Sequence, residues 1–120
     1  MKSLKSILEA SIKVEHDTRN CTFRTNGGEL CYFDEAITIE GFENCIEIQT
    51  LVVSNRRNGI GTTLVNACKD YADRVKKDIV LCASPLTDVI SEDNLIDFYM
   101  KLGFQHIDGK PKSILKYSHK

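Results

Sequence analysis

The first half of the chain alternates between apolar and polar positions, a period of two that predicts β-strands. Two short runs of this kind, residues 21–25 and 29–33, are separated by Asn-Gly-Gly at 26–28. Asn-Gly is typical of a tight hairpin turn, because both residues tolerate a left-handed backbone. The pattern therefore predicts an antiparallel hairpin over these residues.

Two more alternating runs precede the middle of the chain. Residues 36–42 alternate with Ile37 and Ile39 on one face, and a turn at 43–44 separates them from the longest run, 45–53. The same period of two predicts a strand in each. The first half of the chain is thus expected to form four consecutive strands.

The second half changes to the period of a helix. Ser91 can cap a helix that ends at Leu102, with Gly103 suited to the left-handed position that follows. Residues 3–14 place four aliphatic side chains on one helical face. Residues 62–77 predict the longest helix, with a core-facing side made of Leu64, Val65, Cys68, Tyr71, Ala72 and Val75. Strands are predicted at 78–83, 104–107 and 113–117.

This order of elements predicts an α/β fold with a mixed, mostly antiparallel sheet and helices on both faces. The apolar run 78–83 is expected to be a central strand parallel to 45–53, because a helix connects the two. A chain of 120 residues is long enough for its own core. We therefore expect a single domain over residues 1–120.

Composition and charge indicate which kinds of partner to expect and in which cellular compartment the protein lies. The net charge of −1 gives no basic surface for nucleic acid. No apolar run approaches the ~18 residues that a membrane span needs, and the N-terminus lacks the apolar core of a secretory signal. The five cysteines are odd in number and form no CxxC pair. These features predict a cytoplasmic protein with reduced thiols and no metal site.

Residues 51–64 lead from a strand to a helix through the turn Arg56-x-x-Gly59-x-Gly61. Glycines let backbone N–H groups approach an anion, and the start of a helix adds a partial positive charge, so the turn predicts a pyrophosphate site. No lysine follows Gly61, which excludes a Walker loop. Leu64 occupies the position of the third glycine in the dinucleotide fingerprint, which excludes that motif.

The spacing Arg56-x-x-Gly59-x-Gly61 resembles the [Gln/Arg]-x-x-Gly-x-[Gly/Ala] signature of the GNAT acetyltransferase superfamily. A second segment, Phe-Tyr-Met-Lys-Leu-Gly-Phe at 98–104, is similar to the [Leu/Phe]-Tyr-x-x-x-Gly-Phe element of that family. In length and layout the chain is similar to small phage-type members, with an abbreviated N-terminal part. The chain departs from the usual pattern in a shortened turn before the glycines.

The resemblance implies acetyl-CoA as the co-substrate. In the family, the end of the central strand binds the pantetheine arm through its backbone, which here involves Leu51, Val52 and Val53. The oxyanion donor would be the N–H of Leu51 or Val52. Asn94 would assist pantetheine binding, although it is out of register with the family's asparagine, and the alternative is an ordinary helix residue. For Arg57 the alternatives to a pyrophosphate contact are the 3′-phosphate of the CoA nucleotide or solvent. The residues implied at the pyrophosphate are Arg56, Arg57, Asn58, Gly59, Ile60, Gly61 and Thr62.

Two side chains are implied in catalysis. The position of Tyr99 matches the family's general acid for the departing thiolate, and the alternative is an aromatic on the buried face of a helix. Glu47 matches the general-base glutamate of histone-type members, and the alternative is the polar face of an alternating strand. A base or a water relay is useful because a lysine amine, with a pKa near 10.4, is charged at neutral pH.

The acceptor is expected to be a primary amine, on a small molecule or a protein lysine, attacked directly without a covalent enzyme intermediate. A chain of this size has no extra substrate domain, so the acceptor would lie in an open groove or across a homodimer interface. Acidic side chains before the loop would attract a cationic amine if they line one cleft. The alternatives are a catalytically silent acyl-CoA-binding module and an inhibitory protein that modifies a host factor.

Overall fold

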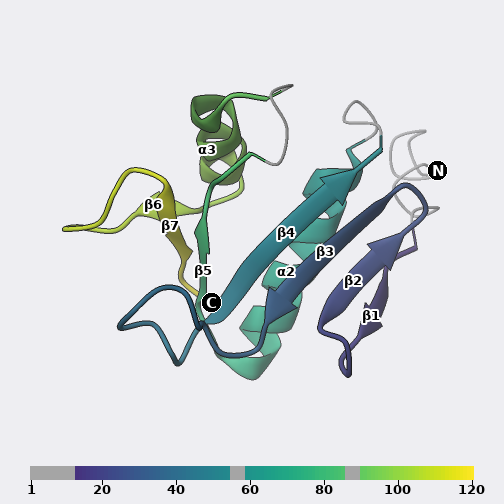
Figure 1. Ribbon diagram of the computed structural model, residues 1–120. Helices are drawn as coiled ribbons and strands as arrows, with labels where there is room; N and C mark the ends of the chain where they lie inside the picture. The colour runs from purple at the N-terminus through teal and green to yellow at the C-terminus, as the bar shows by residue number, and fades with distance from the viewer. Residues whose placement is uncertain (1–12, 55–58, 86–89) are drawn as a thin grey trace, which may run out of the picture.

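The computed structural model describes residues 13–54, 59–85 and 90–120. Seven strands form one sheet in the order β1-β2-β3-β4-β5-β7-β6, in which β4 and β5 are parallel and the other neighbours are antiparallel (Figure 1). The elements in chain order are β1 Glu15–Asp17, β2 Thr22–Thr25, β3 Gly28–Phe33, β4 Ile46–Val53, α2 Ile60–Val75, β5 Ile79–Cys82, α3 Glu92–Lys101, β6 Gln105–His106 and β7 Ile114–Tyr117. The predicted mixed, mostly antiparallel α/β fold is confirmed.

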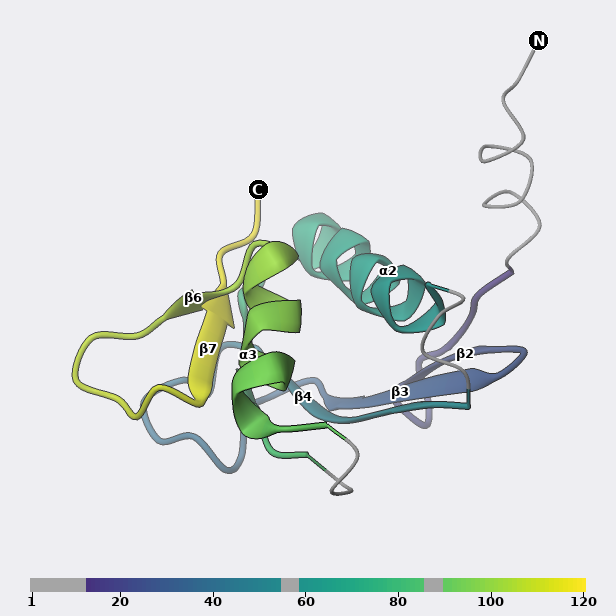
Figure 2. The same cartoon turned by 90° about the horizontal axis from the view of Figure 1, so that it is seen from above.

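Helices α2 and α3 both pack on the same face of the sheet, where they share one hydrophobic core with it. Figure 2 shows α2 over β3 and β4, and α3 next to it on the side of β7. The apolar side of α2 contributes Leu64, Val65, Cys68 and Ala72, which are fully buried. Val75, expected on that side, is the last residue of α2 and is 41% exposed. The predicted helix at 3–14 falls almost wholly in residues 1–12, outside the described residues, so helices on both faces stay a prediction.

The opposite face of β4 and β5 is covered by the segment 34–45 rather than by a helix. Ala36, Ile39 and Cys45 pack there against Val80 in a second small core. The predicted strand at 36–42 is wrong: this segment makes bends and turns, and Ile37 is 70% exposed while Ile39 is buried. It pairs with no strand, because two of its backbone N–H groups donate to the buried carboxylate of Glu47 in β4.

The hairpin of β2 and β3 is confirmed, with Asn-Gly-Gly at the turn. Gly28 allows close packing there, since a Cβ atom would lie 2.6 Å from Cγ2 of Ile60 in α2. The sequence missed β1, a three-residue edge strand. The predicted strand 104–107 is shorter in the structure, at two residues. Within the described part of the chain, no helix is long and apolar enough to cross a membrane.

Strand β4 pairs with β5 only over its first three residues. The parallel ladder joins Ile46 to Ile79 and ends at the pair Ile48 and Leu81, although β4 continues to Val53. At this point β4 carries an irregularity against β3, because Cys31 pairs with Thr50 and Tyr32 with Ile48. The residue between these partners, Gln49, is extra, as in a β-bulge. A bulge bends the strand that carries it, so β4 and the chain after β5 separate beyond this point.

Candidate acyl-donor site

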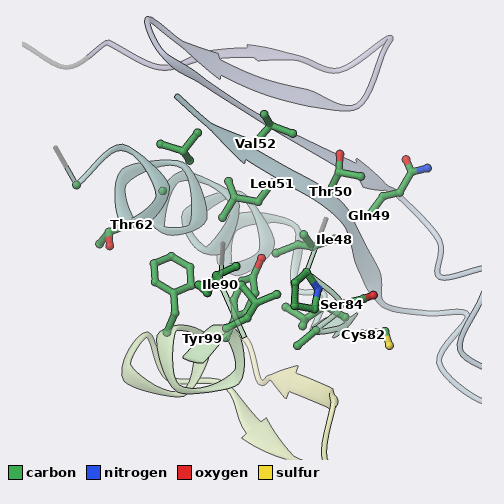
Figure 3. A pocket seen from close by; sticks show the side chains of 18 residues that line it. Ile48, Gln49, Thr50, Leu51, Val52, Thr62, Cys82, Ser84, Ile90 and Tyr99 are labelled. Atoms are coloured by element: carbon green, nitrogen blue, oxygen red, sulfur yellow. The ribbon is translucent and has the colours of Figure 1, made fainter. Parts of the chain in front are cut away.

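A pocket of about 450 Å³ occupies the split between β4 and β5. One wall is the second half of β4, the other is the end of β5 with the chain that follows it, and α3 closes the helix side (Figure 3). Gly59, Gly61 and Thr62 at the start of α2 form one end. The lining is mainly apolar with a few polar groups, which is the usual make-up of a small-molecule site. The remaining lining residues are Ile48, Gln49, Thr50, Leu51, Val52, Val53, Leu81, Cys82, Ala83, Ser84, Pro85, Ile90, Leu95, Phe98 and Tyr99.

Some backbone N–H and C=O groups of β4 point into this split. The N–H of Ser54 donates to the carbonyl of Gly27 at 2.8 Å, which fixes the alternation of the β3–β4 ladder. Leu51 and Val53 therefore occupy non-hydrogen-bonded positions, and their N–H and C=O groups point away from β3. On that side β5 has already ended, so these groups can pair with a ligand lying along the split.

The start of α2 has the geometry that suits an anion. Its N-cap is Gly59, in the left-handed conformation at φ 69°, and no side chain of the described residues caps the helix. The first turn also contains no acidic residue. The first N–H groups of a helix have no partner inside it, and the helix dipole makes this end positive. At Gly61 an added Cβ atom would lie 3.5 Å from Phe98 and from Val53, an ordinary van der Waals distance, so the helix start lies directly beside these two side chains.

The side chain of Tyr99 reaches the pocket from α3. It is 4% exposed and packs edge-to-face between the rings of Phe98 and Phe104, with centroids 5.1 and 5.4 Å away. Figure 3 shows its hydroxyl turned toward Ile48 and Leu51, and it makes no hydrogen bond to another described residue. Burial raises the pKa of this phenol above its ordinary value. The hydroxyl is therefore protonated at neutral pH and free to donate a hydrogen bond into the pocket.

Glu47 lies on the other face of the sheet and does not line the pocket. It is 4% exposed, and Oε1 accepts hydrogen bonds from the N–H groups of Ile37 and Thr38, both at 3.0 Å. Its Oε2 accepts from the hydroxyl of Thr38. A buried carboxylate with three donors is well satisfied, and it holds the segment 34–45 against the sheet.

No protein-family model and no curated protein sequence matches the chain. Among solved structures, the fold is similar to a Corynebacterium glutamicum protein described as histone acetyltransferase HPA2 and related acetyltransferase. That match has a TM-score of 0.55 and 19% identity, and covers 91% of this chain and 64% of that one. The structure is also similar to the anti-CRISPR protein AcrVA5, with a TM-score of 0.69 and 33% identity, covering 81% of this chain and 96% of AcrVA5. The chain belongs to the GNAT acetyltransferase superfamily. The resemblance of its motifs to that family is thus confirmed.

The GNAT motifs meet at one site in the structure. Of the residues that the resemblance implied, the pocket brings together Leu51, Val52, Val53, Gly59, Gly61, Thr62 and Tyr99. Three others lie elsewhere: Glu47 on the far face, Ile60 in the core, and Asn94 in the first turn of α3, where its N–H donates to the capping Ser91 at 3.1 Å. Arg56, Arg57 and Asn58 lie outside the described residues.

The structure adds residues that motif reading missed. Gln49 and Thr50 border the pocket from β4, and Cys82 and Ser84 border it from the chain at the end of β5. No motif marks them. A signal was present in the lengths of the two strand-like runs, because the run at 45–53 is longer than its parallel partner at 78–83. Where one strand extends beyond its neighbour, its backbone N–H and C=O groups on that side have no strand to pair with.

Proposed function

We propose that the chain is an N-acetyltransferase that moves an acetyl group from acetyl-CoA to a primary amine by direct attack. The observation that carries the proposal is the hydroxyl of Tyr99, which has no hydrogen-bond partner among the described residues and borders a split into which backbone groups of β4 point. Membership of the GNAT superfamily supports the same chemistry. The acceptor is a small amine or a protein lysine, and a homodimer is one way to complete its site.

The donor would bind along the split. Its pantetheine arm would pair with the outward N–H and C=O groups of Leu51 and Val53, as an added strand would. The N–H of Leu51 faces the split while that of Val52 faces β3, which favours Leu51 as the oxyanion donor. The pyrophosphate would lie on the open start of α2 at Gly59, Gly61 and Thr62, with Arg56, Arg57 and Asn58 completing its contacts.

Acid and base would act from opposite faces of the sheet. Tyr99 comes from the helix face, where it would protonate the departing CoA thiolate. Glu47 comes from the other face, and we keep it as the proposed base for the amine through a water relay. An ionised carboxylate has about four acceptor sites, so the three donors already present leave room for one more hydrogen bond. The amine would attack the thioester from the face of Glu47, and the CoA thiolate would leave toward the face of Tyr99. The tetrahedral intermediate between these two steps would be held in the split.

A second candidate function is inhibition. The similar protein AcrVA5 is named for anti-CRISPR activity, which favours a chain that disables a host factor. In that case the acetyl acceptor is a protein, or the fold serves only to bind acyl-CoA and a partner. A purified chain that binds acetyl-CoA but transfers nothing to any amine would support the silent form of this alternative.

The direct test is transfer itself. The chain is incubated with acetyl-CoA and, in separate arms, spermidine or a pool of short lysine-containing peptides, and free CoA thiol and acetylated products are measured by a thiol reagent and mass spectrometry. We expect thiol release that depends on the amine, with one acetyl group added to it. Glu47→Gln should lower the rate by ~100-fold, the lower end for an acid–base group, with acetyl-CoA binding retained. Full activity in this variant would remove Glu47 from the mechanism, and wild-type protein without transfer in every arm would contradict the enzyme proposal.

A further inference from the structure

Lys69 lies at the point where α2, α3 and β7 meet. It is half-buried on α2, and its Nζ donates a hydrogen bond of 2.7 Å to the carbonyl of Leu102, the C-cap of α3. The same ammonium stands 4.9 Å from the ring centroid of Tyr117 in β7, a cation–π distance. A cation at the C-terminal end of a helix also interacts favourably with its dipole. One lysine therefore anchors the end of α3 to two other elements.

Both contacts of Lys69 lead to Tyr99, one in a single step and the other in two. The N–H of Leu102 donates to the carbonyl of Tyr99 at 3.0 Å, so the bonded C-cap is tied to the backbone that carries this side chain. The rings form a second connection, because Tyr117 packs on Phe104 at 5.7 Å and Phe104 packs on Tyr99 at 5.4 Å. Moving the ammonium would therefore disturb both the backbone and the ring support of Tyr99.

Gly103 lies beside the same contacts. It follows the C-cap at φ +96°, and a Cβ atom there would lie 3.8 Å, an ordinary van der Waals distance, from Nζ of Lys69 and from the ring of Tyr117. The ammonium, the ring and the residue after the C-cap are therefore neighbours at the end of α3.

We propose that Lys69 is a positioning residue that sets the direction of the Tyr99 hydroxyl in the split. This inference rests on the proposed acid role of Tyr99. Proton transfer to a leaving group depends steeply on alignment, and a displacement of about 1 Å can cost on the order of 100-fold in rate. Donor binding depends instead on β4 and the start of α2, which Lys69 does not contact through either of these interactions. Its loss should therefore reduce kcat and leave the affinity for acetyl-CoA nearly unchanged.

The test uses Lys69→Met, which keeps most of the aliphatic stem, and Lys69→Arg, which keeps the charge and a donor. We expect kcat for CoA thiol release, with the lysine-peptide pool as acceptor, to fall roughly tenfold in the first and to recover largely in the second. Lys77→Met is the matched control, because Lys77 also donates to a backbone carbonyl, that of Asp34, at 2.8 Å but far from Tyr99. This control should keep the wild-type kcat.

A double-mutant cycle with Tyr99→Phe separates positioning from general loss of structure. If Lys69 acts through the hydroxyl, Lys69→Met should cost almost nothing further once that hydroxyl is absent. Equal costs in both backgrounds, or a wild-type kcat in Lys69→Met, would overturn the inference alone. A wild-type kcat in Tyr99→Phe would overturn the acid role and the inference together, as would a wild-type chain that releases no CoA thiol.

Discussion

Replacing Tyr99 by phenylalanine is expected to lower kcat about 100-fold while acetyl-CoA binds as before. A general acid contributes roughly 100- to 10,000-fold, and the lower end applies here because a thiol with a pKa near 8.5 is a fair leaving group even without protonation. The ring stays in place between Phe98 and Phe104, so the core loses only one oxygen atom. Steady-state rates of CoA release and calorimetric titration with acetyl-CoA measure the two quantities.

Tyr32→Phe is the matched control for this substitution. Tyr32 is also buried in the core on the helix face, but its hydroxyl is hydrogen-bonded to Nε2 of His16 at 2.6 Å and lies outside the pocket. Losing that bond should cost about 1 kcal/mol of unfolding free energy and leave kcat unchanged. If both variants lost activity equally, or if Tyr99→Phe kept the wild-type rate, the acid assignment would be wrong.

Replacing Thr62 by aspartate is expected to weaken acetyl-CoA binding by roughly 10- to 100-fold without destabilising the fold. Thr62 lines the pocket at the third position of α2, where the free N–H groups would receive the pyrophosphate. A carboxylate there competes for these donors and repels the phosphates, at about 4 kcal/mol for unit charges 4 Å apart near a protein surface, before salt screening reduces it. The same carboxylate suits the helix dipole, so the unfolding free energy should stay level or rise by about 0.3–1 kcal/mol.

Asn66→Asp controls for the added charge. Asn66 is exposed on α2 one turn further along and does not line the pocket. It changes the net charge by the same amount, so a purely global effect would weaken binding equally in both variants. Calorimetric titration measures donor affinity and thermal unfolding measures stability. Wild-type affinity in Thr62→Asp would show that the anion does not lie on the start of α2.

The elements that the sequence predicted well are those whose signal is local. Asn-Gly-Gly at 26–28 fixes the β2–β3 hairpin by its own backbone preferences. Ser91 caps α3 through the N–H of Asn94, and Gly103 ends it at φ +96°, both as expected from residue type alone. The glycines at 59 and 61 and the Phe-Tyr segment were placed correctly at the ends of helices for the same reason, while their roles toward a ligand stay predictions.

The elements that it missed depend on contacts distant in the chain. Residues 36–42 alternate like a strand, yet the N–H groups of Ile37 and Thr38 bond to Glu47 in β4 and not to a neighbouring strand. Nothing in the local sequence indicates this partner. The sequence around Gln49 likewise does not predict the bulge, because a bulge depends on how β3 pairs with β4. This bulge decides that Leu51, and not Val52, turns its N–H into the split. The choice between those two donors therefore needed the structure.

The molecule that fits the split between β4 and β5 can be identified by its effect on thermal unfolding. Thermal unfolding with acetyl-CoA, ATP or NAD at equal concentration compares a pantetheine-bearing nucleotide with two that lack that arm. A ligand at a hundredfold excess over its Kd adds about 2.7 kcal/mol, which for a domain of this size raises Tm by roughly 10 °C. We predict a shift of this order with acetyl-CoA and a much smaller one with ATP or NAD. No shift with acetyl-CoA, or an equal shift with all three, would contradict an acyl-CoA site.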